Sequence, residues 1–198
     1  MDVFEAIRTT RAMRRIDPDR PVSDADLRTI VEAATKGPSG GNSQPVRWLV
    51  VTDPEKRRRL GEIYQKAWEP VSRYYKTQPM GDTPVMRSAD HLGEHFADAP
   101  AVVIPCAAQS GMTGDSSVFG AVQNLCLAAR ALGLGTTLTT VHKLHEQEVR
   151  DVLGIPDDVV TYCMIPVGYP TGKWGEAKRK PVDQVMYWNT WEQPPPAG

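Results

Sequence analysis

Four polar segments contain residue types that can do chemistry and that a folded core does not require. They are Thr10-Arg11-Ala12-Met13-Arg14-Arg15, Pro38-Ser39-Gly40-Gly41-Asn42-Ser43-Gln44-Pro45, Leu138-Thr139-Thr140-Val141 and Lys178-Arg179-Lys180-Pro181. Arginines from distant parts of the chain can hold a phosphate through charge-assisted, bidentate hydrogen bonds. A loop rich in glycine, serine and asparagine can bring backbone donors close to a planar ligand. Together the segments indicate a site for a planar ligand that carries a phosphate.

Two motifs point to other chemistries. Residues 37–41 match the G-x-S-x-G pattern of serine hydrolases, whose nucleophile requires a strand before the turn and a helix after it. Here the predicted order is helix, loop, strand, so acyl transfer by Ser39 is disfavoured. His91 and His95 match H-x-x-E-H, in which two histidines one helical turn apart bind zinc. Gly93 weakens such a helix by about 1 kcal/mol, and no third ligand is evident, so we expect both histidines on a solvated or rim helix.

His142 and His145, together with Glu146, are a further candidate for acid–base chemistry. The sequence fixes no partner for either histidine, which favours a role in a loop or at a helix start. The chain contains neither a P-loop nor a G-x-G-x-x-G motif, so an independent phosphate-binding unit of either kind is not supported. We expect no metal site.

Length and composition are those of one globular domain. The chain has 198 residues, of which 40% are hydrophobic and 24% charged, enough to build one large core. A formal net charge of −1 lacks the basic surplus of non-specific nucleic-acid binding, so we expect no nucleic-acid partner. Cys106, Cys126 and Cys163 lie in apolar stretches without a CxxC pair, which predicts reduced core residues. Neither a signal peptide nor a membrane-spanning run is evident, so we expect a cytoplasmic protein with no membrane partner.

The elements that position the polar segments begin with helices. We expect a first helix from Asp2 through Met13 that delivers the arginine cluster Arg8, Arg11, Arg14 and Arg15. A second helix begins at the capping pair of Ser23 and Asp26 and ends at Gly37-Pro38. The apolar run 48–51 predicts a strand. Asp53-Pro54 then opens a third helix, which faces inward through Leu60, Ile63, Tyr64, Ala67 and Trp68 and exposes residues 56–59.

The remaining chain alternates between irregular and regular stretches. Periodicity disappears between Pro70 and Ala89, and a loop of that length is typical of a lid or rim. We expect a helix over 88–97, a strand covered on both faces over 101–104, and a buried apolar helix over 118–132.

Further along, strands are predicted over 136–141 and 159–167, with a short helix over 144–153 between them. The tail from Pro170 ends in a proline-rich segment that we expect to be disordered. These elements indicate a single domain of the α/β or α+β class.

The ordered set of motifs resembles the nitroreductase family of flavin mononucleotide (FMN) enzymes over nearly the whole chain. The matching marks are Arg11 to Arg15 with Pro21-Val22, residues 33–45 read as AATKGPSGGNSQP, Ala131 to Thr136, Leu153 to Pro156, Ile165 to Pro170, and Lys178 to Val182. This resemblance implies an α+β fold of three layers, α/β/α, with a mixed, mostly antiparallel sheet between helices. It also implies a single domain over 1–198 whose C-terminal arm, 170–198, is exchanged with the partner of a homodimer.

The resemblance further implies a cofactor site shared between the two subunits. Arg11 would bind the phosphate or ribityl chain, Arg14 would face the N1–C2 carbonyl edge of the ring, and Arg179 would hold the phosphate. Leu138 to Val141 would lie along the isoalloxazine, and the loop after Gly37 would contact it from the partner. The full set of implied cofactor contacts is Arg11, Ala12, Met13, Arg14, Pro38, Ser39, Gly40, Asn42, Gln44, Leu138, Thr139, Thr140, Val141 and Arg179.

The function implied is the reduction of nitroaromatics, quinones or related small electron acceptors by NADH or NADPH in a ping-pong mechanism. FMN supplies the electron chemistry, so no side-chain nucleophile is required, and Arg14 acts as an electrostatic stabiliser. Two alternatives stay open. One is a flavin-binding store or sensor with little turnover; the other keeps the fold but carries out reductive dehalogenation or uses a deazaflavin.

Overall fold

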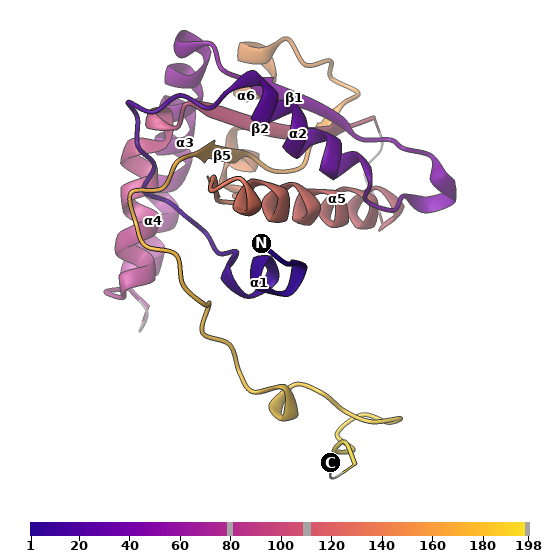
Figure 1. Ribbon diagram of the computed structural model, residues 1–198. Coiled ribbons are helices and arrows are strands. Elements are labelled where there is room, and N and C mark those ends of the chain that lie inside the picture. The colour runs from indigo at the N-terminus through magenta and orange to yellow at the C-terminus, as the bar shows by residue number, and fades with distance from the viewer. Residues whose placement is uncertain (79–80, 109–111, 197–198) are drawn as a thin grey trace.

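A sheet of five short strands forms the middle layer (Figure 1). The computed structural model describes residues 1–78, 81–108 and 112–196, with the side chains of 112–113 left aside. The strands are β1 (Arg47–Val51), β2 (Ala101–Ala107), β3 (Gly135–Thr136), β4 (Val160–Thr161) and β5 (Ile165–Gly168). Their order is β1-β2-β5-β3, with β4 also paired to β2, and every one of these pairings is antiparallel.

The central strand β2 explains why helices cover both faces of the sheet. Every residue of β2 is buried, as its uninterrupted apolar run predicts. Side chains alternate between the two faces of a strand, and Ala101 and Val103 join one core while Val102 and Ile104 join the other. The expected three-layer arrangement follows directly from this alternation. All three cysteines are buried and free, as predicted.

Helices α2 (Asp24–Thr35) and α5 (Met112–Ala131) pack against each other on the first face. The Asp26 amide donates to Ser23 Oγ (3.0 Å), so the predicted cap begins α2. Ile30 and Ala34 are fully buried against α5 and the sheet. α5 ends close to Gly133, which adopts a φ of +77° that favours glycine.

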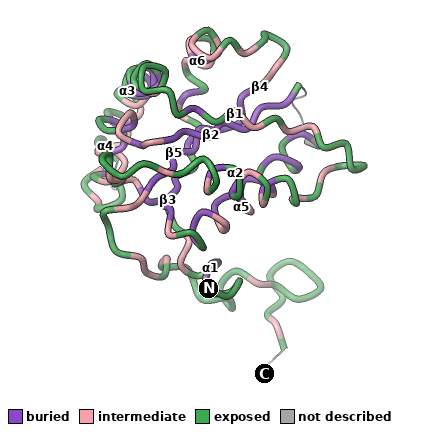
Figure 2. Tube along the Cα trace, turned by 45° about the horizontal axis from the view of Figure 1, so that its top comes forward, coloured by how far each residue is buried: buried purple, intermediate pink, exposed green. Residues whose placement is uncertain are grey.

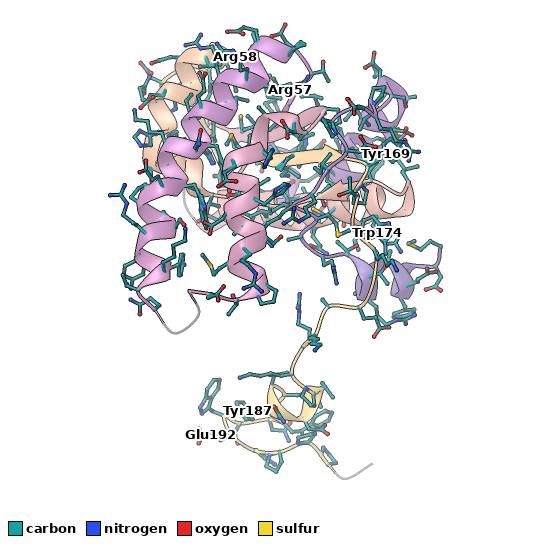
Figure 3. The ribbon with its side chains drawn as sticks, turned by 90° about the vertical axis from the view of Figure 1, so that its left-hand side faces the viewer. Arg57, Arg58, Tyr169, Trp174, Tyr187 and Glu192 are labelled. Atoms are coloured by element: carbon teal, nitrogen blue, oxygen red, sulfur yellow. The ribbon has the colours of Figure 1, made fainter. Side chains whose placement is uncertain are left out.

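Helices α3 (Pro54–Lys76), α4 (Pro84–His95) and α6 (Glu146–Leu153) cover the second face. Asp53 caps α3 by accepting from the Lys56 amide at 2.8 Å. The prediction that residues 56–59 face solvent is wrong for Arg57 (Figure 3), whose Nη1 donates to the carbonyls of Ala97 and Ala99 at 2.9 Å each. The 3-10 turns are Gly40–Asn42, Phe96–Asp98, Val141–His145 and Val182–Gln184.

The expected loop between Pro70 and Ala89 is wrong, because α3 continues through Pro70 to Lys76 and α4 begins at Pro84. Side-chain contacts between the two helices hold the end of α3. Trp68 Nε1 and Ser72 Oγ both donate to Asp90 Oδ1 of α4, at 2.9 and 2.5 Å. These tertiary contacts outweigh the loss of one helical hydrogen bond at proline. Residues 79–80 of this stretch lie outside the described residues.

Other boundaries also differ from expectation. The first helix, α1 (Val3–Thr9), ends before Arg11, so Met13 and most of the arginine cluster lie in an extended segment. Of the predicted strand 136–141, only Thr136 joins the sheet ladder, as the second residue of β3. The predicted strand 159–167 is divided into β4 and β5. The predicted helix 144–153 is a 3-10 turn followed by α6.

The chain after Pro170 leaves the domain as an extended arm (Figure 2). It carries exposed apolar side chains at Val182, Val185, Tyr187, Trp188 and Trp191. We expect the proline-rich end of the chain to be disordered. Residues 197–198 of that end lie outside the described residues. Among the helices that the structure describes, none is both long and apolar enough to cross a membrane.

Candidate cofactor site

Two of the four predicted segments lie side by side. The Met13 amide donates to the Thr136 carbonyl (2.9 Å), and Thr137 Oγ1 donates to the Met13 carbonyl (2.9 Å). Gly135 makes this approach feasible, because a Cβ there would lie 2.8 Å from Met13 Cβ. The chain from Arg11 to Arg14 is therefore anchored on the edge of the sheet, next to the segment 138–141.

The segment 138–141 lies outside the sheet ladder, and its last residue, Val141, begins a 3-10 turn. Thr139 exchanges two backbone hydrogen bonds with Met164, at 3.0 and 2.9 Å. Thr137 and Thr139 are buried, whereas Leu138 and Thr140 point outward. Leu138 is 43% exposed. The segment thus presents an apolar side chain and backbone groups beside Arg11, Arg14 and Arg15, which we call the arginine strip.

Arg14 meets this segment through Tyr64 of α3. The Tyr64 hydroxyl lies 3.1 Å from Thr139 Oγ1. Burial lowers the pKa of Arg14, which is half-buried, and burial raises the pKa of Tyr64, which interacts electrostatically with Arg14. Sequence reasoning placed Tyr64 only among the inward residues of a helix. The available signal was the hydroxyl itself, because a buried tyrosine normally needs a polar partner.

Arg11 and Arg14 fit an anionic ligand. Within residues 1–78, 81–108 and 112–196, neither forms an ion pair with a carboxylate. A partly buried cation without a counter-charge is costly. Arg14 is half-buried and Arg11 is exposed. An electron-rich ring edge beside Arg14 would offset that cost, and a phosphate could pair with Arg11, so this donor set suits FMN.

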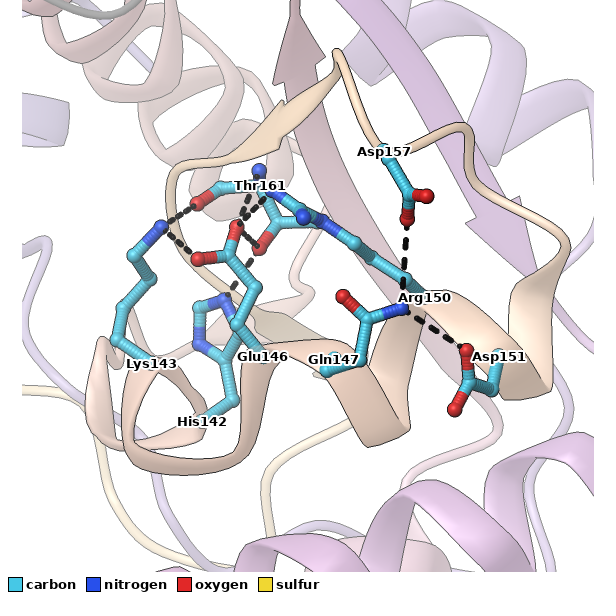
Figure 4. A network of polar contacts seen from close by, with 8 residues as sticks. All are labelled: His142, Lys143, Glu146, Gln147, Arg150, Asp151, Asp157 and Thr161. Atoms are coloured by element: carbon cyan, nitrogen blue, oxygen red, sulfur yellow. Dashed lines mark hydrogen bonds and ion pairs between the residues drawn. The ribbon is translucent and has the colours of Figure 1, made fainter.

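A polar network fixes the chain that follows Val141 (Figure 4). Glu146 Oε1 accepts from the Thr161 amide (2.9 Å) and from Thr161 Oγ1 (2.8 Å), and Glu146 Oε2 accepts from Lys143 Nζ (2.5 Å). Burial opposes the charge of Glu146, but these hydrogen bonds outweigh it and lower the pKa to about 2. The network anchors the 3-10 turn Val141–His145, which begins at the last residue of the segment 138–141.

His142 belongs to this network and is fully buried. Its Nε2 lies 3.0 Å from Thr161 Oγ1, and burial lowers its pKa to about 4. The imidazole is therefore neutral at pH 7. His142 and His145 lie in the turn Val141–His145 directly before α6, as the loop or helix-start interpretation predicts.

The loop from Pro38 to Gln44 is built by its own hydrogen bonds. The Gln44 amide donates to Ser39 Oγ (3.0 Å), and Gln44 Nε2 donates to Asn42 Oδ1 (3.3 Å). Asn42 and Gln44 have φ values of 54° and 47°, which side-chain-bearing residues seldom adopt. Helix α2, and not a strand, precedes Ser39, so the context of a hydrolase nucleophile is missing here.

This loop lies far from the arginine strip in the same chain (Figure 1). The Gly40 amide donates to Ser117 Oγ near the start of α5 (3.2 Å). At the other end of α5, Arg130 Nε donates to Thr9 Oγ1 (2.9 Å). At about 1.5 Å per residue the two ends are roughly 20 Å apart. One chain therefore does not bring the two sets of predicted contacts onto one flavin ring.

The arm first follows the arginine strip and then leaves it. The Thr171 amide donates to the Arg15 carbonyl (3.1 Å), and the Arg130 guanidinium lies 4.1 Å from the centre of the Trp174 ring (Figure 3). Beyond this stretch Arg179 is exposed, and its Nη1 donates to the neighbouring Lys178 carbonyl. The structure does not bring Arg179 to Arg11.

The two histidines of the zinc-like motif lie on α4. Their rings stack with centres 4.3 Å apart, and His91 Nδ1 lies 3.3 Å from Arg15 Nη1. His95 Nδ1 lies 2.8 Å from Asp98 Oδ2. Among the described residues no group of three potential metal ligands is found. The pair is a part of the rim beside the arginine strip.

Comparison with known proteins identifies the family of this chain. The nitroreductase family model matches residues 7–169. A Methanothermobacter thermautotrophicus protein, provisionally named NADH dehydrogenase/NAD(P)H nitroreductase, is 30% identical over 178 residues, covering 86% of this chain and 78% of its own. An Archaeoglobus fulgidus protein with the same provisional name is 28% identical, covering 81% and 82%.

A solved structure of oxidised iodotyrosine deiodinase bound to FMN and 3-iodo-L-tyrosine superposes with a TM-score of 0.78. It is 23% identical and covers 96% of this chain and 100% of its own, so the likeness concerns the fold. The α+β fold class predicted from the motifs is confirmed, while exchange of the arm stays a prediction. The chain belongs to the nitroreductase family.

Proposed function

We propose that this protein is an FMN-dependent oxidoreductase that uses NADH or NADPH to reduce nitroaromatics, quinones or related electrophiles in a ping-pong mechanism. Family membership and the nitroreductase relatives support the oxidoreductase class. The observation that carries the proposal is Arg14, a half-buried cation without a carboxylate partner among the described residues, next to the segment 138–141. FMN, when bound, supplies a ring that takes up a hydride and passes the electrons to the acceptor.

The residues of the chain would hold and polarise that ring. Arg14 would stabilise the negative charge that reduction leaves on the N1–C2 carbonyl edge, and such preorganised charge contributes several kcal/mol in enzyme sites, about 3–4. Leu138 would offer an apolar contact to the ring, and a backbone amide of 138–141 a hydrogen bond. Arg11 and Arg179 would hold the phosphate.

We further infer that the protein is a homodimer in which each site is shared. The loop 38–44 and the arginine strip lie at opposite ends of α5, so the loop of one subunit would serve the strip of the other. Val3, Phe4 and Ile7 of α1 are more than half exposed. Exposed apolar groups of this kind mark interaction surfaces, and a second copy with its arm would cover them.

Stopped-flow absorbance of Arg14→Ala tests the proposal. We expect reduction of bound flavin by NADPH to slow by about 100-fold, the effect of losing one preorganised donor, while FMN binding weakens less. Arg15→Ala is the matched control, because it removes a neighbouring exposed guanidinium that contacts His91. An unchanged reduction rate at full flavin occupancy would exclude this role for Arg14. A protein that binds FMN but is not reduced would favour a flavin store.

The likeness to iodotyrosine deiodinase favours one second candidate, reductive dehalogenation. Both reactions would use the same reduced flavin, so the acceptor distinguishes them. Mixing the reduced protein with 3-iodo-L-tyrosine or with a nitroaromatic should give faster reoxidation with the nitroaromatic. Faster reoxidation by the iodinated substrate would support the dehalogenase instead.

A further inference from the structure

Tyr64 lies between two parts of the proposed flavin site. Its side chain is 2% exposed, and its ring stacks on Phe96 with centroids 4.4 Å apart. The hydroxyl reaches Thr139 Oγ1 at 3.1 Å. Because Phe96 and the rigid helix α3 hold the ring, the position of the hydroxyl is fixed by the core.

Thr139 connects the fixed Tyr64 hydroxyl to the backbone of the segment 138–141. Its backbone pairs with Met164 in both directions, and its Oγ1 also accepts from the Val141 amide at 3.4 Å. The hydrogen bond between the two hydroxyls favours one rotamer of Thr139. The same bond therefore restrains the backbone groups predicted to face the flavin.

Arg14 is the charged group that acts on Tyr64. The guanidinium and the phenol interact electrostatically, and Tyr64 is buried while Arg14 is half-buried. Burial raises the pKa of Tyr64, so the hydroxyl keeps its proton at neutral pH. The phenol thus presents a dipole, and not a charge, to Arg14 on one side and to Thr139 on the other.

We propose that Tyr64 is a positioning residue that fixes the segment 138–141 beside Arg14 and thereby raises the reduction potential of the bound flavin. The inference rests on the proposed function. A cation stabilises developing negative charge best when it needs no reorganisation. Without the hydroxyl, the Thr139 side chain loses its partner, the segment 138–141 beside Arg14 is less restrained, and the electrostatic stabilisation of the reduced ring weakens.

The test compares Tyr64→Phe with the wild-type protein, each loaded with FMN. The substitution removes one oxygen and keeps the stack on Phe96. We expect similar FMN affinity by fluorescence titration and a midpoint potential lowered by about 30 mV, which is about a tenfold change in a two-electron equilibrium. Tyr169→Phe is the matched control, because the Tyr169 ring lies under the Arg20 guanidinium, outside the site, and its potential should equal that of the wild type.

Thr139→Val examines the same contact from the other side. If Tyr64 acts through Thr139, the two substitutions together lower the potential by less than the sum of their separate effects. This variant also keeps the inference testable if Tyr64→Phe does not fold. A purely structural role would lower the melting temperature of the FMN-free protein and leave the potential unchanged.

The outcomes separate this inference from the proposed function. If FMN-loaded Tyr64→Phe has the wild-type potential, the role of Tyr64 is overturned and the flavin site stays intact. If Tyr64→Phe does not fold, the same result with Thr139→Val has the same meaning. A wild-type protein that binds no FMN would overturn the proposed function, and the inference would fall with it.

Discussion

The two halves of the proposed flavin site differ in how far a single chain fixes them. The half formed by the arginine strip and the segment 138–141 is anchored by backbone pairing, by Tyr64 and by the network around Glu146. The half formed by the loop 38–44 and the arm after Lys178 is exposed and contacts mainly itself. One chain therefore preorganises one half, and the other half is suited to a second chain.

The exposed half also carries the apolar surface that a second chain would cover. Trp191 is 81% exposed, and Tyr187 packs edge-on against it with ring centres 4.9 Å apart. Large exposed aromatic groups are typical of interfaces. Changes in the exposed half should therefore affect dimer formation and FMN binding, whereas changes in the anchored half should affect the stability of the single chain.

Removing the end of the arm, residues 178–198, should have the largest effect. We expect loss of the dimer and of nearly all bound FMN, because the arm contributes the exposed aromatic groups and Arg179. Sedimentation velocity and flavin absorbance would measure both. A truncated protein that remains a dimer with full flavin content would show that the anchored half is sufficient.

Arg179→Ala addresses the exposed half without removing the arm. Loss of a charge-assisted phosphate contact worth about 1.5–3 kcal/mol should weaken FMN binding by about 10-fold to 150-fold, enough to release flavin on dialysis. Lys180→Ala, which removes a neighbouring positive charge, is the control. Full cofactor content in both variants would contradict phosphate binding by Arg179.

Gly135→Ala addresses the anchored half. The new Cβ would lie 2.8 Å from Met13 Cβ, and overpacking of this kind costs about 1–3 kcal/mol of the free energy of unfolding. Gly172→Ala is the matched control, since its nearest neighbour is Met13 Cε at 3.9 Å. Urea unfolding would detect the difference. Equal stability of the two variants would mean that the arginine strip is not held tightly on β3.

His142 tests the anchoring network by its pH dependence. The pKa is lowered to about 4 from 6.5, so between these values the unfolded chain binds the extra proton and stability falls as the pH falls. The loss between pH 7 and pH 5 should be about 2 kcal/mol. His142→Gln should remove this loss of stability between pH 7 and pH 5, whereas His95→Gln on the exposed face of α4 should not. Parallel losses in all three proteins would contradict a buried neutral imidazole.

Sequence reasoning succeeded where local and tertiary preferences agree. The cap at Ser23 and the apolar run at 101–104 each allow one structure, and both formed as predicted. The loop predicted from Pro70 onward was wrong. Proline locally tends to end a helix, but the contacts of Trp68 and Ser72 with Asp90 keep α3 intact.

The candidate site shows the same division. The arginines and the segment 138–141 could be found from their residue types and from the family resemblance. Tyr64 could not, because its pattern is that of any inward helix residue and its partner Thr139 is 75 positions away. Long-range contacts of this kind leave no local signal.

Native mass spectrometry of the FMN-loaded protein tests the central claim most directly, namely that two chains complete each flavin site. We predict complexes of two chains with two FMN molecules and free chains without flavin. A single chain that carries one FMN would contradict the shared site.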